Sequence, residues 1–131
     1  MLFKKLIPAF IWALFILGLC ALPGKVIPEL TFLDWLKPDK IVHLFLFGVL
    51  SFLLIKAFRE QPAAFLVNRQ SATIAIFISS CYGILIEVLQ EYVFIGRTGD
   101  KYDAMADALG AFIGLWFLSY RNRREAAKRK V

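Results

Sequence analysis

The chain has 131 residues, of which 60% are hydrophobic, and it carries a formal net charge of +6. Soluble domains average about 45–50% apolar residues, and a domain of this size buries only roughly two thirds of its surface on folding. The composition therefore argues against a disordered chain, a disulfide scaffold and an ordinary water-soluble enzyme domain. It predicts a membrane protein.

Four apolar runs follow one another along the chain, and each is long enough for one membrane crossing. A crossing helix needs about 20 predominantly apolar residues. Because the bilayer interior offers no partners for backbone polar groups, such runs are expected to be helices. We therefore predict an all-α protein with a single transmembrane domain over residues 1–131, built as a four-helix bundle. The predicted spans are 6–22, 41–58, 72–94 and 103–120, followed by a basic tail over 121–131.

The charged residues predict how the bundle sits in the membrane. Lys and Arg gather in cytoplasmic segments, and here most of them precede the first span, follow the second or form the tail. All acidic residues except Glu60 and Glu125 fall toward the opposite side. This bias predicts a multi-pass membrane protein with four crossings and both termini in the cytoplasm. The alternative is three crossings, with the first run acting as a cleaved signal peptide.

Three smaller features concern surfaces that meet lipid or a neighbouring helix. Residues 28–38 predict a short helix on the outer membrane surface, with Trp35 at the level of the headgroups. The basic tail predicts contact with anionic lipid rather than with nucleic acid. Gly110 and Gly114 are four residues apart, a spacing that lets two helix backbones approach closely. We favour packing within the bundle, and a homo-oligomer formed through these glycines is the alternative.

Ionisable residues in or beside the predicted spans mark a candidate site, because charge in lipid is costly and is usually functional or paired. The orientation of the spans places these residues at one end of the bundle, and residues three or four apart share a helix face. We therefore predict a polar pocket that opens outward between the second, third and fourth helices. Its candidate ligand-binding residues are Asp39, Lys40, His43, Glu87, Gln90, Arg97, Asp103 and Asp107.

Structural roles compete with a binding role for several of these residues. Asp100 or Asp103 suits the N-cap of the fourth helix, and Lys40 or Arg97 can reach lipid phosphates. Glu87 is the hardest to explain in this way, because a carboxylate below the headgroups needs a partner or a proton. A polar ring that only fixes the register of the helices is the structural alternative.

An ordered set of short motifs runs from Asp39 to Gly114. It reads Asp39-Lys40-x-x-His43, then Gly83 with Glu87-x-x-Gln90, then Arg97, Asp103, Asp107 and Gly110. This set resembles the VanZ-like family of small membrane proteins, named after a protein linked to teicoplanin resistance. Asp107 departs from the family pattern, which has Asn at that place, and so adds a carboxylate. The resemblance implies a four-span fold, a location in the bacterial cytoplasmic membrane and a connection with the cell envelope and antibiotic resistance, but no reaction.

The leading functional hypothesis is a pocket that binds or handles an envelope lipid or a glycopeptide-related molecule. Lys40, His43 and Arg97 would form charge-assisted hydrogen bonds with phosphate or other anionic groups. Glu87, Gln90 and Asp107 would orient these cations or bind polar groups of the ligand.

Three other classes of function stay open. A membrane-embedded enzyme would use His43 with Glu87 or Asp103 as acid and base, or a divalent cation held by Glu87, Asp103 and Asp107. An oligomeric transporter or channel subunit would relay cations through Glu87 and Asp107, and an assembly module would use the polar residues only for packing. The sequence contains none of the short nucleophile, zinc or phosphate-loop motifs, so we name no metal site and no cofactor.

Overall fold

The computed structural model describes residues 2–23, 38–59 and 70–129. In these ranges the chain forms four α-helices and no strand, which confirms the all-α prediction. The helices are α1 (Leu2–Ala21), α2 (Pro38–Arg59), α4 (Ser71–Tyr92) and α5 (Lys101–Lys128). The surface helix predicted over 28–38 lies outside the described residues.

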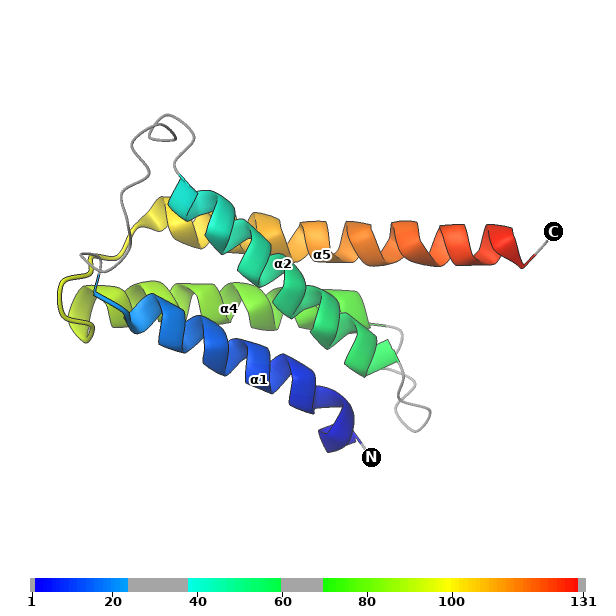
Figure 1. Cartoon of the computed structure of the whole chain (residues 1–131), viewed down its shortest axis with the longest axis horizontal. Helices are drawn as coiled ribbons and strands as arrows, with labels where there is room; N and C mark the ends of the chain where they lie inside the picture. The colour runs from blue at the N-terminus through cyan, green and yellow to red at the C-terminus, as the bar shows by residue number, and fades with distance from the viewer. Residues whose placement is uncertain (1, 24–37, 60–69, 130–131) are drawn as a thin grey trace.

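The helices run in alternating directions along one bundle axis (Figure 1). The last turn of α1 lies at the same end as the first turns of α2 and α5 and the last turn of α4, and both marked chain ends lie toward the opposite end. The alternation matches the predicted succession of crossings, with both termini on one side. It also brings the polar motifs of α2, α4 and α5 to a common end.

The observed helices contain or overlap the predicted spans, and the largest difference is at the C-terminus. α5 continues through the predicted tail to Lys128 and projects beyond the other helices (Figure 1). Arg, Glu, Ala and Lys, which make up most of this extension, all have high helix propensity. An Arg121–Glu125 ion pair at 3.6 Å, with the spacing of one helical turn, adds to it. Net basic charge therefore does not mark the end of the helix.

The outer surface of the bundle is apolar, as a lipid-facing surface should be. Among the described residues, three helices are long and apolar enough to cross a membrane: Phe3–Ala21, Asp39–Arg59 and Ser71–Tyr92. Large side chains such as Phe10, Phe45, Phe77 and Phe112 are exposed along the bundle. The protein is therefore a multi-pass membrane protein.

The fourth predicted span lies within α5, which is not one of these three helices. It carries Asp103 and Asp107 on the side that is buried in the bundle, while Leu109, Phe112 and Trp116 are exposed. α5 packs along α2 and α4. Its place as a crossing helix therefore rests on packing beside two apolar helices rather than on composition.

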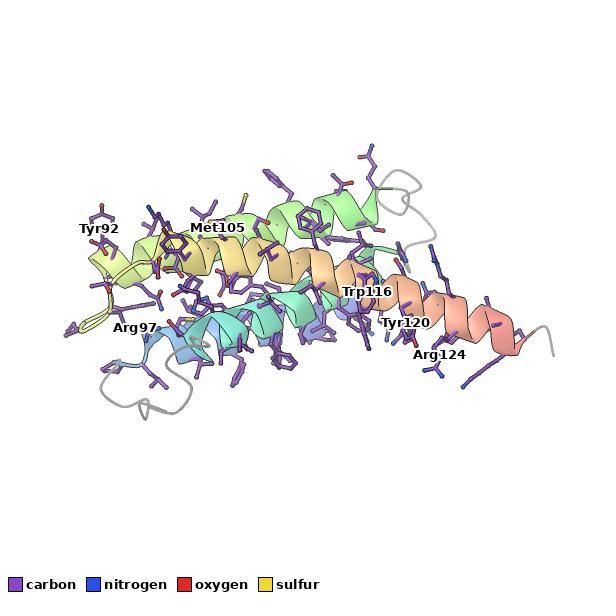
Figure 2. The ribbon with its side chains drawn as sticks, turned by 90° about the horizontal axis from the view of Figure 1, so that it is seen from above. Tyr92, Arg97, Met105, Trp116, Tyr120 and Arg124 are labelled. Atoms are coloured by element: carbon purple, nitrogen blue, oxygen red, sulfur yellow. The ribbon has the colours of Figure 1, made fainter. Side chains whose placement is uncertain are left out.

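Exposed aromatic residues lie toward both ends of the bundle (Figure 2). Tyr92 ends α4, whereas Trp116 and Tyr120 stack on each other toward the far end of α5, with ring centroids 5.9 Å apart. Trp and Tyr favour the two membrane–water interfaces because their rings are apolar and their N–H or O–H groups are polar. The two groups are consistent with a bundle that crosses the bilayer.

α1 is attached to the rest of the bundle by partly buried hydrogen bonds and by apolar packing. The indole Nε1–H of Trp12 donates to the carbonyl oxygen of Leu46 at 2.9 Å, and the hydroxyl of Tyr82 donates to the carbonyl oxygen of Ala13 at 2.7 Å. Ala9, Ile16 and other residues of α1 belong to the same apolar core as α2 and α4. These contacts join α1 to the other three helices in one bundle.

Glycines form the contact between α2 and α5. A Cβ atom on Gly110 would clash with the carbonyl oxygen of Leu44, and a Cβ atom on Gly114 would clash with that of Gly48. The hydroxyl of Ser51 then donates to the carbonyl oxygen of Ala111 at 2.8 Å. Gly110 and Gly114 thus pack inside the chain, as favoured from the sequence, and the association of two copies stays untested.

Candidate functional site

The connection between α4 and α5 is tied to α4 by two carboxylates. Glu91 accepts a hydrogen bond from the backbone N–H of Gly99 at 2.9 Å, and Glu87 accepts one from that of Asp100 at 2.7 Å. A Cβ atom on Gly99 would lie 2.7 Å from the carbonyl oxygen of Glu87, so only glycine fits there. These contacts set where α5 begins relative to α4.

Asp100 is the N-cap of α5. It has an extended backbone conformation, and its carboxylate accepts a hydrogen bond from the N–H of Tyr102 at 2.8 Å. Such a cap satisfies one of the free N–H groups at a helix start. Of the two capping candidates in the sequence, Asp100 takes this role, which leaves the side chain of Asp103 for other contacts.

Lys40 links the starts of α2 and α5. Its Nζ atom lies 2.9 Å from Oδ2 of Asp100 and 2.5 Å from Oδ1 of Asp103. The side chain of Lys40 is 24% exposed, while that of Asp103 is almost fully buried. Its ammonium group therefore compensates a buried carboxylate while the Lys40 side chain stays partly exposed.

His43, Glu87 and Asp107 meet below this ion pair, one from each of α2, α4 and α5. Nδ1 of His43 lies 2.9 Å from Oδ1 of Asp107 and 3.9 Å from Oε1 of Glu87. All three residues are buried, and the side chain of Asp107 is 0% exposed. Oδ2 of Asp107 has no hydrogen-bond partner among the described residues.

Gln90 connects Glu87 to Arg97. With its amide oriented so that both its oxygen and its nitrogen are satisfied, the oxygen accepts from Nη2 of Arg97 at 2.8 Å and from Nε at 3.3 Å. The amide nitrogen donates to Oε2 of Glu87 at 3.3 Å. The opposite orientation gives a single hydrogen bond, to the carbonyl oxygen of Cys20 at 3.3 Å, so the network favours the first.

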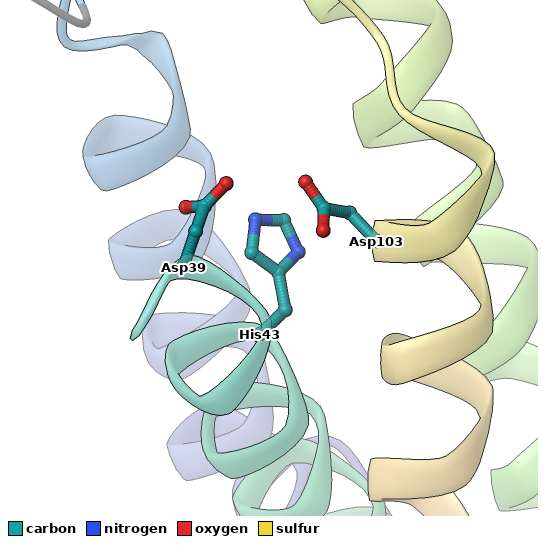
Figure 3. A group of neighbouring side chains, drawn as sticks. All are labelled: Asp39, His43 and Asp103. Atoms are coloured by element: carbon teal, nitrogen blue, oxygen red, sulfur yellow. The ribbon is translucent and has the colours of Figure 1, made fainter. Parts of the chain in front are cut away.

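The imidazole of His43 also lies close to the carboxylates of Asp39 and Asp103. Figure 3 shows its imidazole ring between the carboxylates of Asp39 and Asp103. One potential ligand atom from each of these three residues lies within 4.8 Å of the other two, and the same holds for His43, Glu87 and Asp107. His43 therefore belongs to two overlapping groups of metal-ligand type. The set weighed from the sequence, Glu87 with Asp103 and Asp107, is not one of them.

All eight residues predicted from the sequence lie at the same end of the bundle, and we call them the polar cluster. Most of them contact another member directly, and Asp39 joins through its closeness to His43 and Asp103. Asp39 is exposed, Lys40 and Arg97 are partly exposed, and the others are buried.

Sequence reasoning missed three contributors to the cluster. Phe47, one turn after His43, stacks nearly parallel to the imidazole, with centroids 6.4 Å apart. Glu91 and Gly99 fix the loop through the contacts described above. The i, i+4 spacing of His43 and Phe47 is visible in the sequence, but nothing there pairs Glu91 with a backbone group eight residues later.

A family model described as VanZ/LLP1 matches residues 5–122. The chain belongs to the VanZ/LLP1 family. The match takes in all four described helices up to the first residues of the basic extension of α5, so it confirms the resemblance seen in the ordered motifs. No curated protein and no solved structure matches the chain.

Proposed function

We propose that this VanZ/LLP1 protein binds the polar headgroup of an envelope lipid, or a glycopeptide-related molecule with similar groups, at the polar cluster. The observation that carries the proposal is the convergence of charged side chains from three helices at one end of an apolar bundle. His43, Glu87 and Asp107 are buried there. Charged groups in this position are expensive unless they are paired or used.

The outer edge of the cluster offers the groups that a headgroup needs. Lys40 and Arg97 are partly exposed and carry N–H donors suited to phosphate oxygens. Asp39 is exposed beside them and accepts hydrogen bonds from amines or hydroxyls. A ligand at this edge would meet both donors and acceptors without entering the packed core.

The charge balance favours a headgroup that is not purely anionic. Asp39, Glu87, Asp103 and Asp107 outnumber the cations Lys40 and Arg97, and Lys40 is already bonded to carboxylates. A phosphate with a neighbouring amine, or a sugar with several hydroxyls, can satisfy both signs. The proposed ligand class is therefore a zwitterionic or glycosylated lipid headgroup rather than a simple anion.

The proposal assigns the cluster to the outer face of the bacterial cytoplasmic membrane. The basic residues of the N-terminus and of the extension of α5 lie toward the opposite end, which the positive-inside tendency assigns to the cytoplasm. Envelope lipids and glycopeptides are exposed on the outer side. The link to antibiotic resistance belongs to the same proposal.

Lipid retention tests the headgroup proposal. The full chain would be reconstituted in nanodiscs of mixed phosphatidylethanolamine and phosphatidylglycerol, extracted in mild detergent, and examined by native mass spectrometry for bound lipid. We expect the wild type to retain phosphatidylethanolamine in preference, and Lys40→Ala and His43→Ala to retain less. Lys101→Ala is the matched control, because Lys101 is exposed near the same end of the bundle and, like Lys40, contacts the ring of Tyr102. Equal retention by all four proteins, or no lipid preference, would contradict the proposal.

One contact supports enzymatic handling of the ligand as a second candidate. Asp107 is hydrogen-bonded to Nδ1 of His43, an arrangement that fixes the tautomer and orientation of a histidine acting as general base. The ring then faces Asp39 and Asp103 at the outer edge (Figure 3). Incubating the protein with phosphatidylethanolamine and analysing the lipid by mass spectrometry would reveal a product. His43→Gln should abolish product formation, and an unchanged lipid with the wild type would count against this candidate.

A further inference from the structure

The innermost residues of the polar cluster combine one imidazole with two carboxylates. His43, Glu87 and Asp107 come from three different helices, and a ligand atom of each lies within 4.8 Å of the others. The Lys40 pair does not reach them directly, because its ammonium group contacts Asp100 and Asp103 instead. The group is thus a separate triad below the ion pair.

The two carboxylates of the triad are not matched by an equal positive charge. Asp107 is fully buried, and its Oδ2 atom has no hydrogen-bond partner among the residues that the structure describes. Leaving a buried carboxylate oxygen without a partner costs at least about 1–3 kcal/mol. The imidazole of His43 is shared between Asp107 and Glu87, so it compensates at most one of the two carboxylates. A bound cation would supply the positive charge that the two carboxylates lack.

The spacing of the triad suits a metal ion. Zinc lies about 2.0–2.2 Å from imidazole nitrogen and carboxylate oxygen, which places neighbouring ligand atoms roughly 3–3.5 Å apart. Nδ1 of His43 lies 2.9 Å from Oδ1 of Asp107, just below that range, and 3.9 Å from Oε1 of Glu87, just above it. Because a ligand atom of each residue lies within 4.8 Å of the other two, small side-chain movements would bring all three ligands onto one ion.

The surrounding contacts hold the ligands in place. Oε2 of Glu87 accepts from the N–H of Asp100 at 2.7 Å and from Gln90, which leaves Oε1 for the triad. Phe47 stacks against the imidazole of His43. Outer contacts of this kind orient ligands in metal sites and contribute to their affinity.

We propose that His43, Glu87 and Asp107 bind a divalent transition-metal cation such as Zn²⁺ or Mn²⁺. The imidazole ligand favours these ions over Mg²⁺ and Ca²⁺, which prefer all-oxygen ligands. Three protein ligands leave a coordination position open, toward which a polar ligand can approach. This metal-site proposal does not depend on the binding of a lipid headgroup at the outer edge of the polar cluster.

Metal titration of the purified full chain tests this proposal. Protein made with a tag free of histidine would be stripped with chelator, exchanged into metal-free detergent buffer and titrated with Zn²⁺ and Mn²⁺ by calorimetry. We expect one cation per chain. Asp107→Asn and Glu87→Gln should each weaken binding by more than about 100-fold, because even outer-shell changes cost about 10–100-fold. Glu125→Gln is the matched control on α5, since Glu125 is exposed, pairs with Arg121 and lies outside the polar cluster.

Two further measurements separate the inner triad from its alternatives. Asp39→Asn removes a carboxylate that belongs only to the outer group of Asp39, His43 and Asp103. It should therefore leave the affinity for Zn²⁺ within about twofold of the wild type. A large loss of affinity in Asp39→Asn with none in Glu87→Gln would overturn the assignment. X-ray absorption of the Zn²⁺ complex should show one imidazole and oxygen ligands, which does not depend on any variant folding. Absence of saturable Zn²⁺ binding by the wild type, or absence of imidazole from the spectrum, would also overturn the assignment.

Discussion

The carboxylate of Asp107 on α5 occupies the space beside Gly83 of α4. A Cβ atom on Gly83 would lie 2.6 Å from Oδ2 and 2.7 Å from Cβ of Asp107. The position of Asp107 is set from the other side by its hydrogen bond to His43. Gly83, which belongs to the motif shared with the family, thus leaves space on α4 for the side chain of Asp107 on α5.

We expect Gly83→Ala to destabilise the protein through this contact. Overpacking of a well-packed interior typically costs about 1–3 kcal/mol, which outweighs the gain of up to about 1 kcal/mol that alanine brings to a helix. Gly18→Ala is the control, because a Cβ atom at Gly18 meets nothing within 4 Å. Thermal unfolding in detergent should show a lower midpoint for Gly83→Ala and an equal or higher one for Gly18→Ala. Equal midpoints for Gly83→Ala and wild type would show that Asp107 can move aside without cost.

We expect Lys40→Ala to lower stability far more than Lys101→Ala. Removing Lys40 leaves the carboxylate of Asp103 buried without its ammonium partner. Breaking a fully buried pair costs about 3–5 kcal/mol, and the partial exposure of Lys40 reduces this to roughly 2–3 kcal/mol. Lys101 is exposed, and its ammonium group lies over the ring of Tyr102, a contact worth about 0.5 kcal/mol. Chemical unfolding of both variants in the same detergent measures the difference, and similar losses would contradict a special role for Lys40.

The apolar runs made the helices predictable, because a stretch of lipid-soluble residues has few structures open to it. The end of α5 was not predictable in the same way. The sequence places a change from apolar to basic residues near Arg121, but helix propensity and the Arg121–Glu125 pair carry the helix to Lys128. Hydropathy reports where lipid ends, whereas helix length depends on local propensity.

The site was predictable as a location but not as a set of partners. Helix direction and spacing place His43, Glu87 and Asp107 at one end of the bundle, and the structure brings them together. The choice of Asp100 as the cap and of Asp103 as a partner of Lys40 depends on where the loop begins α5. That start is fixed by Glu87 and Glu91 contacting backbone N–H groups, which no side-chain pattern reveals.

We expect Gly114→Ala to weaken the packing of α5 on α2 without changing the number of copies that associate. A Cβ atom at Gly114 would clash with the carbonyl oxygen of Gly48 inside the same chain, so the helices must separate. Overpacking of this kind costs about 1–3 kcal/mol. Light scattering in mild detergent should give the same mass for variant and wild type while the unfolding midpoint falls. A change in mass with an unchanged midpoint would instead indicate that Gly114 contacts a second copy.

The orientation of the bundle can be measured with single cysteines in a chain whose Cys20 and Cys81 are replaced by alanine. Thr98 is exposed in the loop beside the polar cluster, and Lys128 is exposed at the far end of α5. Because basic segments stay in the cytoplasm, we expect a membrane-impermeant maleimide to label Thr98→Cys in intact cells and Lys128→Cys only after permeabilisation. A chain that keeps Cys81 alone is the control: this thiol is exposed on the apolar surface of α4 and should stay unlabelled, since a membrane-impermeant reagent does not enter the bilayer. The reverse pattern would place the polar cluster on the cytoplasmic face and remove its access to ligands outside the cell.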